Sequence, residues 1–359
     1  METTTHSKKS LYAYFGELGL FETNIPGHTF YQIGLLDSIS EKFETEKFDF
    51  LNYISDKYTA GHGGGPLFPT DKIGKLMSQT ANRLIADFMP SYPEVIERIK
   101  NREYDRLFLK ARFRNLSTLQ KKLKDAFIFE DIIQTALAVG YEPSKIVILD
   151  TDLSLSESFI TRLGQLGISR EIPSITMPGM SKRFIDDCLE IHESTSENFK
   201  ISNLIYYGNL SFENYKEGHS KNTIINDIIE SVDGVKMFDN TGFTMTVAAK
   251  RDLALENWLS NLNKLELIGR EDRAAIWEHH KLSIASINVS KDLYLEKGFI
   301  PARVYEAIIF GTIPVSYKKG LHPAMTFDTV DDFWEICKFL EECSRKDYLK
   351  ILRQCAESL

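Results

Sequence analysis

The sequence predicts an α/β protein with two doubly wound domains, each a parallel sheet with helices on both faces. Its 359 residues exceed the roughly 100–200 that a single domain usually contains. Short apolar segments alternate with segments of helical periodicity along the chain, which is typical of parallel strands joined by helical crossovers. Residues 145–149 (KIVIL) form a short, almost wholly apolar and β-branched run, as expected for a strand buried on both faces.

The first half of the chain is expected to contain four strands and two helices. The strands are predicted by apolar runs at residues 11–15, 48–54, 106–111 and 145–149. The helices are predicted by apolar residues at helical spacing over 28–39 and 119–139, and Gly140 is placed to end the second one. Residues 56–100 hold a glycine-rich loop (GHGGGP) and helical material around 73–88, and we interpret them as an insertion.

The second half repeats this pattern. Its strand candidates are residues 204–207, 236–238, 265–268, 282–287 and 313–317, with helical stretches between them. A polar run over 192–200 (HESTSENFK) predicts the linker, and helical spacing resumes from residue 331. We therefore expect an N-terminal domain over 1–193, a second domain over 200–330 and C-terminal helices over 331–359. The two domains are expected to face each other across a cleft.

Composition limits the class of protein. A hydrophobic fraction of 43% with 26% charged residues excludes wholesale disorder. The chain has no run near the roughly 20 apolar residues of a membrane helix, and its N-terminus lacks the apolar core of a signal peptide. Its four cysteines show no Cys-x-x-Cys spacing, which predicts reduced thiols. We expect a cytoplasmic monomer.

The charge of the chain is uneven. The 43 basic and 51 acidic residues give a net charge of −8, which argues against a DNA-binding protein. Residues 98–124, however, contain ten basic and two acidic residues, a local +8 within a remainder of −16. This basic segment, which includes Arg112 and Arg114, is explained equally by a solvated helical face and by a binding surface for a polyanion.

Two familiar catalytic motifs are excluded, and one pair of histidines is not interpreted as a metal site. The loop HGGGP resembles the oxyanion loop of lipases, but the Gly-x-Ser-x-Gly elbow that such enzymes need is absent. The chain also lacks the Gly-x-x-x-x-Gly-Lys-Ser/Thr phosphate loop. His279 and His280 are adjacent and point in different directions on a helix, so we interpret them as surface histidines rather than metal ligands.

Two carboxylates follow the clearest strand. Asp150 and Asp152 lie just past residues 145–149, where open α/β sheets bind ligands in the crevice beyond the strand ends. One of them could serve as a general base, or the two could hold a divalent metal such as Mg²⁺ or Mn²⁺. A turn with a helix N-cap explains the same residues without any function.

Two further segments fit a nucleotide ligand. The turn YGNLS at 207–211 follows a strand and precedes a helix expected from about residue 220, so a phosphate could approach its backbone N–H groups. Arg303 and Glu306 share one helix face, where the guanidinium could bind a phosphate and the carboxylate a ribose. A surface ion pair would explain this spacing equally well.

The helix Arg-x-x-Glu followed by Gly-Thr-Ile-Pro-Val resembles the nucleotide-sugar motif of GT-B glycosyltransferases, which consist of two Rossmann-like domains. Within that class, the order of features resembles the T-even phage DNA β-glucosyltransferases. The shared features are YDRL at 104–107, the strand that ends at Asp152, the turn YGNLSF, Tyr294, and the Arg303–Glu306 helix. The departures are two missing arginines beyond the glycine turn, the insertion at 56–100, and an expected end before the last helix of that family.

The resemblance implies roles for particular residues. Asp152 would be the catalytic base, with Arg303 at a phosphate, Glu306 at the ribose, and Gly208 and Ser211 at the diphosphate. The nucleotide-sugar site would comprise Gly208, Ser211, Lys216, His219, Lys221, Gly269, Arg270, Tyr294, Arg303 and Glu306. His28, Arg112 and Arg114 would contact the acceptor or DNA.

The leading hypothesis, which follows from this resemblance, is a glycosyltransferase that moves a sugar from a UDP-sugar to a hydroxymethylated base in double-stranded phage DNA. UDP-glucose is the favoured donor, and hydroxymethylcytosine is the favoured base. If a phage encodes the protein, we expect it in the cytoplasm of the infected host cell. One alternative is a GT-B enzyme that acts on a small molecule, a glycan or a protein. Another is a metal-dependent glycosyltransferase that uses Asp150 and Asp152. A non-catalytic nucleotide- or DNA-binding module is the alternative outside enzymes.

Overall fold

The computed structural model describes most of both predicted sheets. The described residues are 9–15, 26–53, 71–88, 90–111, 127–149, 172, 174–175, 179–195, 203–208, 210, 220–234, 242–249, 253–269, 273–290 and 300–359. Contacts divide the chain into two compact units. Unit 1 comprises Met1–Glu22, Gln32–Phe68 and Lys75–Ser181, and unit 2 comprises Thr23–Tyr31, Pro69–Gly74 and Lys182–Leu359. The predicted domain limits and the cleft between the domains stay predictions.

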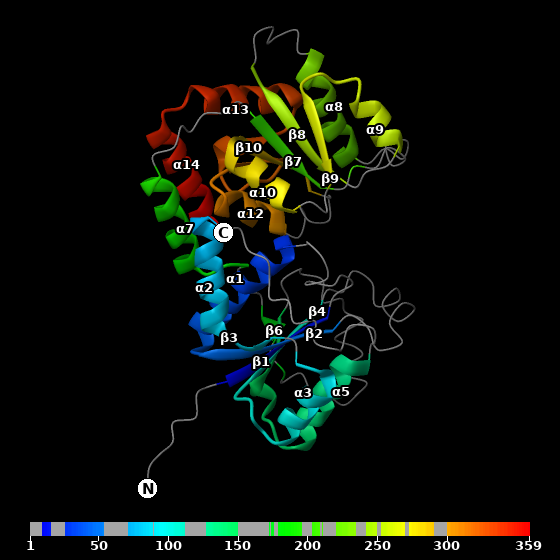
Figure 1. Ribbon diagram of the computed structural model, residues 1–359, viewed down its shortest axis with the longest axis vertical. Helices are drawn as coiled ribbons and strands as arrows, with labels where there is room; N and C mark the ends of the chain where they lie inside the picture. Colours follow the sequence, from blue (N-terminus) through cyan, green and yellow to red (C-terminus); the bar gives the residue numbers. More distant parts are fainter. Residues whose placement is uncertain are drawn as a thin grey trace. The chain divides into compact units, whose positions relative to one another are not determined.

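Unit 1 contains one parallel sheet in the order β3-β2-β1-β4-β5-β6 (Figure 1). Its strands are β1 (Lys9–Phe15), β2 (Lys47–Tyr53), β3 (Ile85–Phe88), β4 (Leu107–Ala111), β5 (Ile146–Leu149) and β6 (Ser174–Ile175). The described helices that lie wholly or mostly in unit 1 are α1 (Pro26–Phe43), α2 (Lys72–Leu84), α3 (Tyr92–Lys100) and α5 (Phe127–Ala138), with a short 3-10 turn η2 (Pro143–Lys145) before β5. The chain thus winds outward from β1 in one direction and from β4 in the other, which is the Rossmann order.

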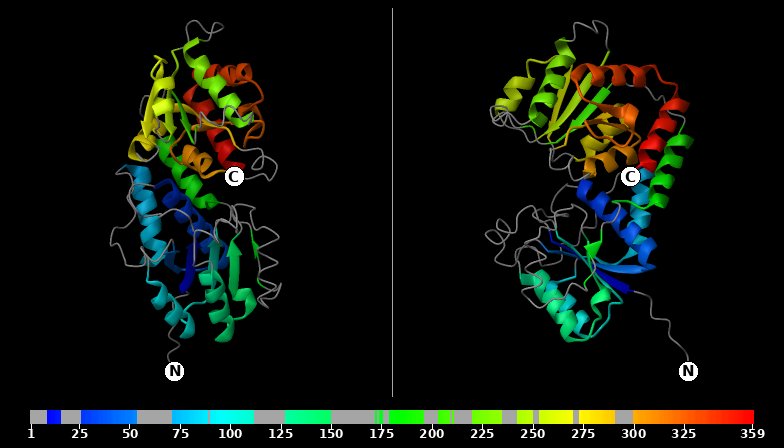
Figure 2. Two further views of the ribbon diagram at one scale, coloured as in Figure 1. Left: turned by 90° about the vertical axis from the view of Figure 1, so that its right-hand side faces the viewer. Right: turned by 180° about the vertical axis from the view of Figure 1, so that it is seen from behind.

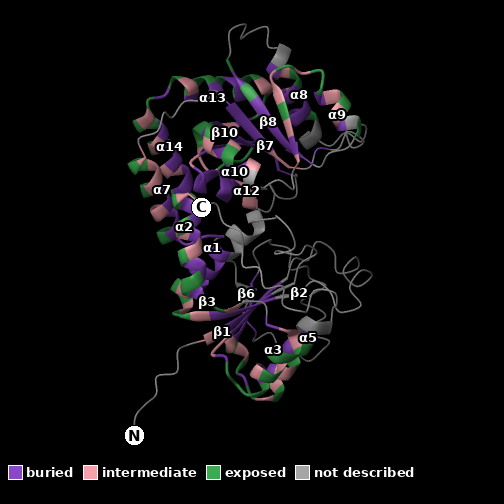
Figure 3. Cartoon of the chain, in the orientation of Figure 1, coloured by how far each residue is buried: buried purple, intermediate pink, exposed green. Residues whose placement is uncertain are grey.

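Alternating side chains of the strands fill the two faces of this sheet. In β4, Leu107 and Leu109 belong to one buried cluster, which includes Val95 of α3 and Ile132 of α5. Phe108, between them, belongs to the opposite cluster, together with side chains of α1. Both faces of the central strands are therefore apolar, and these strands form nearly continuous hydrophobic runs in the sequence. Figure 3 shows these central strands mostly buried, whereas the edge strand β3 is partly exposed.

Residues 72–100, expected to be an insertion, form part of the sheet. They contain α2, β3 and α3, and β3 pairs in parallel with β2 as the edge strand. The strand is only four residues long and follows α2 without a turn, so its sequence reads as a continuation of helical periodicity. The start of α3 is by contrast well marked, because Ser91 and Glu94 form a capping box.

Unit 2 repeats the topology with the order β12-β11-β10-β7-β8-β9, again all parallel. The strands are β7 (Asn203–Tyr207), β8 (Thr244–Ala249), β9 (Leu265–Gly269), β10 (Ser283–Asn288), β11 (Ile313–Tyr317) and β12 (Thr326–Phe327). The described helices are α7 (Lys182–Ser194), α8 (Ser220–Gly234), α9 (Leu253–Leu259), α10 (Arg273–Leu282), α12 (Ala302–Ile309), α13 (Val330–Glu342) and α14 (Arg345–Glu357), with a 3-10 turn η4 (Pro323–Met325).

The helices of unit 2 form two groups. Helix α13 packs on α8 (Figure 2). At this contact the indole Nε1 of Trp334 donates a hydrogen bond to Ser231 Oγ at 2.8 Å. Helices α7, α12 and α14 pack on one another. The predicted fold class, two Rossmann-like α/β domains as in the GT-B fold, is confirmed by the two sheet orders.

Most expected strands of unit 2 are present, with one omission. Residues 204–207, 265–268, 282–287 and 313–317 correspond to β7, β9, β10 and β11. The expected strand at 236–238 lies outside the described residues, and the strand next to β7 is β8, which the sequence analysis did not predict. In β8 small and polar residues (TMTVAA) weaken the apolar signal.

The structure also bears on the expected reduced thiols and on the expectation that the chain has no membrane helix. All four cysteines are buried free thiols. Burial raises the pKa of Cys188, Cys337 and Cys355, so these thiols are poor nucleophiles at neutral pH. Within the described part of the chain, every helix is too short or too polar to cross a membrane.

Candidate functional site

The candidate site lies at the centre of the sheet in unit 2. Strands β7 and β10 are neighbours there, and the chain leaves β7 toward β8 on one side and β10 toward β11 on the other. The carboxyl ends of two such strands form a crevice, where open α/β sheets bind their ligands. Tyr207 and Asn288 are the last residues of the two strands, and Gly208 follows the first.

Arg303, in the first turn of α12, reaches across these strand ends. Its Nε donates to Asn288 Oδ1 at 2.9 Å. Its Nη1 donates to the carbonyl oxygen of Tyr207 at 3.3 Å, and its Nη2 to the carbonyl oxygen of Val289 at 2.8 Å and to Ser290 Oγ at 3.4 Å. The guanidinium therefore connects the two central strands at their point of divergence, and its predicted contact with a phosphate stays a prediction.

Every one of these partners is neutral. Within the described chain, no carboxylate lies at ion-pair distance from Arg303. Two other arginines differ: Arg98 pairs with Asp49 and Asp87, and Arg353 with Glu193. Arg345, by contrast, also donates only to backbone carbonyl oxygens. The half-buried guanidinium of Arg303 thus keeps its full positive charge, which is favourable where an anionic ligand binds.

Asn288 fixes the position of the guanidinium. Its side chain is 7% exposed, its Oδ1 accepts from Arg303, and its Nδ2 donates to Ser316 Oγ at 3.1 Å. The Ser290 hydroxyl also donates to Asn288 Oδ1, at 3.3 Å. This amide joins β10, β11 and α12, and sequence reasoning missed it because its partners are distant along the chain.

Gly208 leaves room for the guanidinium. Its own N–H donates to the carbonyl oxygen of Ala248 at 3.1 Å, so this group is used within the sheet. A Cβ at this position would lie 2.7 Å from Tyr206 Oη and 3.1 Å from Arg303 Nη1. Burial raises the pKa of Tyr206, against the opposing effect of Arg303, so the phenol stays protonated. Glycine is needed here for close approach.

Glu306 and Gly269 are also described. Glu306 lies three residues after Arg303 in α12 and is 2% exposed. Gly269 ends β9, so it lies at the same carboxyl edge of the sheet, although β9 is the edge strand. Their expected roles at the ribose and the uracil stay predictions.

The other predicted site residues lie outside the described structure. His28 and Lys221 belong to α1 and α8, but their side chains are not described. The residues whose positions are not described are Arg112, Arg114, Asp150, Asp152, Ser211, Lys216, His219, Arg270 and Tyr294. The carboxyl end of β5 is described up to Leu149, directly before Asp150. Among the described residues, no cluster of three or more histidine, cysteine or acidic side chains could hold a metal ion.

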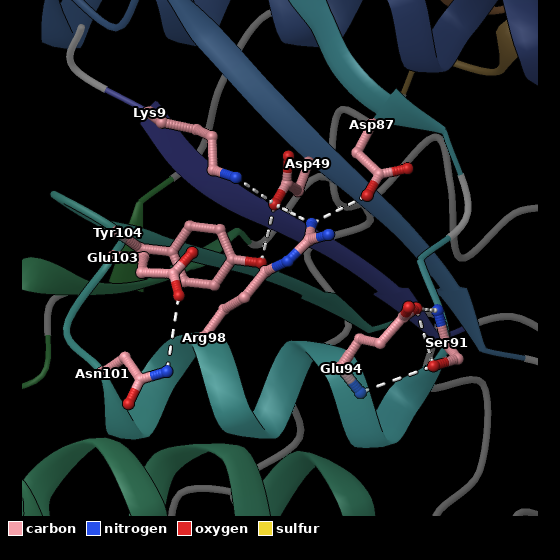
Figure 4. Close-up of polar contacts among 9 residues, drawn as sticks. All are labelled: Lys9, Asp49, Asp87, Ser91, Glu94, Arg98, Asn101, Glu103 and Tyr104. Carbon is pink, nitrogen blue, oxygen red and sulfur yellow. Dashed lines mark hydrogen bonds and ion pairs between the residues drawn. The ribbon is translucent and has the colours of Figure 1, made fainter. Parts of the chain in front are cut away.

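The described part of the basic segment is engaged inside unit 1. Arg98 Nη1 lies 2.6 Å from Asp49 Oδ2 and 2.8 Å from Asp87 Oδ2, and Asp49 also binds Lys9 and the Tyr104 hydroxyl (Figure 4). Burial opposes the charge of Arg98, but its bonds to the two aspartates raise its pKa on balance. Burial and the Asp49 charge raise the pKa of Tyr104. Arg98 therefore has a structural role, whereas Lys100 and Arg102 are exposed.

The histidine expectation needs a correction. His280 is fully buried and stacks on Phe310 with ring centroids 6.2 Å apart. His279 is partly exposed, and its Nδ1 is hydrogen-bonded to Thr246 Oγ1 at 3.0 Å. The adjacent pair does diverge, but only His279 reaches the surface. Helix α10 packs against the sheet with one face, and this face includes His280.

No protein-family model matches the sequence, and no curated protein matches it. Among solved structures, the chain is similar to the DNA-modifying enzyme β-glucosyltransferase, with 14% identity and a TM-score of 0.46, over 97% of this chain and 94% of the other. A mutant of T4 phage β-glucosyltransferase in complex with UDP-glucose is 12% identical with a TM-score of 0.48, over 97% of this chain and 94% of the other. S. aureus MnaA with UDP is 10% identical with a TM-score of 0.46, over 97% of this chain and 91% of the other.

The resemblance expected from the sequence is thus found, as a distant one. The fold assignment itself rests on the two sheet orders.

Proposed function

We propose that this protein is a glycosyltransferase that transfers a sugar from a UDP-sugar to the hydroxyl of a hydroxymethylated base in DNA, with hydroxymethylcytosine as the favoured base. The observation that carries the donor half of the proposal is the positive charge of Arg303. It lies at the point of divergence between β7 and β10, and all its described partners are neutral. A diphosphate is the anion that a Rossmann-like domain most often binds at this place.

The donor would bind with its diphosphate near Arg303 and Gly208. Lys216, His219 and Lys221, which follow the glycine turn, could supply further positive charge. Glu306 would accept hydrogen bonds from the ribose, Gly269 and Arg270 would border the uracil, and Ser211 and Tyr294 would complete the site. UDP-glucose is the favoured donor.

In the proposed reaction the acceptor hydroxyl attacks the anomeric carbon of the sugar. Asp152 takes the hydroxyl proton as the new C–O bond forms, and the bond from the anomeric carbon to the diphosphate breaks. The departing electron pair stays on UDP, whose developing charge Arg303 would stabilise. A divalent metal is optional in this scheme, since the guanidinium already supplies positive charge.

For DNA the target base would have to leave the duplex, at a cost of a few kcal/mol. Because Arg98 is engaged with Asp49 and Asp87, the phosphate contacts would fall to residues 112–124, which include Arg112 and Arg114. The same engagement also favours a second candidate, an acceptor that is a small molecule, a glycan or a protein.

The direct test incubates the protein with a panel of UDP-sugars and either hydroxymethylated or plain DNA, with or without EDTA. The DNA is then digested to nucleosides for mass measurement. We expect one hexose added to the modified base only, and activity in EDTA. Release of UDP without any change in the DNA would favour the second candidate, and UDP binding without turnover would favour a non-catalytic module. Complete dependence on Mn²⁺ would favour the chemistry of an Asp150–Asp152 metal site.

A further inference from the structure

The neutral surroundings of Arg303 point to a residue with a specific task. An arginine tied to a carboxylate is held firmly, but much of its charge is neutralised, as for Arg98 beside Asp49. Arg303 instead donates four hydrogen bonds, and none of them goes to a carboxylate. The only side-chain amide among its partners is Asn288, 2.9 Å from its Nε.

We propose that Asn288, oriented by Ser316, is a positioning residue that holds Arg303 in place without neutralising it, so that the guanidinium can bind the diphosphate of the nucleotide donor. This inference rests on the proposed function, because it assumes that the anion at this site is a nucleoside diphosphate. It adds two residues, on β10 and β11, that neither motif nor resemblance assigned.

The hydrogen bonds determine the orientation of the amide. Its Nδ2 donates to Ser316 Oγ at 3.1 Å, so its Oδ1 faces the guanidinium. Because Asn288 is 7% exposed and Ser316 is 1% exposed, neither can rotate freely toward solvent. An arginine whose plane is set before the ligand arrives loses less entropy when it binds an anion.

The same sheet offers a matched control at its opposite end. Asn203, the first residue of β7, is also 7% exposed, and its Nδ2 donates to Ser283 Oγ at 2.7 Å. Its Oδ1 accepts from Thr244 Oγ1 at 2.9 Å. It therefore joins the three strands β7, β8 and β10, whereas Asn288 joins two strands and the helix α12, and its described partners include no charged side chain.

The test compares Asn288→Asp with Asn203→Asp in the full-length protein. The first exchange keeps an acceptor for Arg303 and adds a carboxylate that neutralises it. We expect the affinity for UDP, measured by calorimetry, to fall about 10- to 100-fold, the value of one charge-assisted hydrogen bond. The affinity for uridine, which lacks phosphate, should change less than twofold. Asn203→Asp should keep the affinity for UDP within twofold.

The outcomes separate the two claims. An equal loss of affinity for UDP and uridine in Asn288→Asp, or equal effects of the two exchanges on UDP, would overturn the positioning role and leave the proposed function intact. Failure of the unaltered protein to bind UDP or any UDP-sugar would overturn both. If Asn288→Asp does not fold, Ser316→Ala replaces it: that variant removes the orienting partner and should weaken UDP binding several-fold while uridine binding is unchanged.

Discussion

The two ends of the sheet in unit 2 carry similar hydrogen-bonding networks with different chemistry. At the amino end, Asn203 joins the hydroxyls of Ser283 and Thr244, and all of these groups are neutral. At the carboxyl end, Asn288 joins Ser316 to the charged guanidinium of Arg303. The amino end satisfies buried polar groups only, whereas the carboxyl end also maintains an uncompensated charge. Under the proposed function, the first network would serve stability and the second would serve ligand binding.

The largest expected effect tests whether residues after the carboxyl ends of the strands in unit 1 also have a functional role. Asp152 follows β5 in the sequence, and Asp152→Asn removes the proposed base while keeping the size of the side chain. We expect kcat to fall about 10²- to 10⁴-fold, the usual contribution of a general base. The affinity for UDP should be unchanged by calorimetry. Unchanged turnover would exclude Asp152 as the base.

The next effect concerns Arg98, one of the arginines of unit 1 that have carboxylate partners. Asp49→Ala leaves Arg98 and Lys9 without their buried counter-ion, and Asp49 itself is fully buried. Breaking a buried ion pair usually costs about 3–5 kcal/mol of unfolding free energy, measured by urea titration. Because this cluster has no part in the proposed site, the affinity for UDP of the folded fraction should be unaffected. Weaker UDP binding with unchanged stability would contradict the assignment.

Arg303→Ala should have the opposite pattern. It removes the charge at the point of divergence, so UDP affinity should fall about 10- to 100-fold. Arg303→Lys keeps the charge but cannot reproduce the four hydrogen bonds, and we expect it to recover only part of the affinity. Full recovery by lysine would mean that charge alone matters and that the orientation set by Asn288 is unimportant.

The amino-end network gives a smaller effect on stability. Asn203→Ala leaves the hydroxyl of Thr244 without its acceptor and removes the donor to Ser283. We expect a loss of about 1–3 kcal/mol in unfolding free energy, since buried polar groups lose their partners. UDP affinity and the salt dependence of UDP binding should match those of the unaltered protein. A variant that loses UDP binding would remove the distinction between the two ends of the sheet.

The sequence predicts those parts of the fold that depend on local pattern. Strand β5 can be predicted because burial on both faces makes its sequence continuously apolar. Arg303 can be predicted because it belongs to a short motif. Strand β8 was missed because threonines and alanines dilute its apolar signal. Asn288 was missed for another reason: its partners, Ser316 and Arg303, come from β11 and α12, and only the folded sheet brings them together.

The smallest expected effect concerns the far end of α12, whose first turn carries Arg303. There His192 Nε2 donates to the carbonyl oxygen of Ile309 at 2.7 Å, and its ring packs on Gly311, which has a φ of +80°. Burial lowers the pKa of His192 below its ordinary value of 6.5, against the opposing effects of the Ile309 carbonyl and Asp71. The unfolded chain therefore takes up a proton on this histidine at a higher pH than the folded chain does. The contribution of neutral His192 to the unfolding free energy should be fully present above pH 6.5. Below that pH the unfolding free energy should fall, by at most about 1.4 kcal/mol per pH unit.

The measurement is unfolding free energy between pH 7.5 and 5.5 for the unaltered protein and for His192→Gln. The variant removes the titrating group and should show the shallower slope, at lower stability throughout. Since α12 begins at the ligand site and ends at His192, the pH effect should appear in stability while UDP affinity at pH 7.5 stays within twofold. A slope identical in both proteins would show that His192 is protonated equally in the folded and unfolded chains. A large loss of UDP affinity in His192→Gln would mean that the position of Arg303 depends on the whole helix, and the positioning role would then extend beyond Asn288 and Ser316.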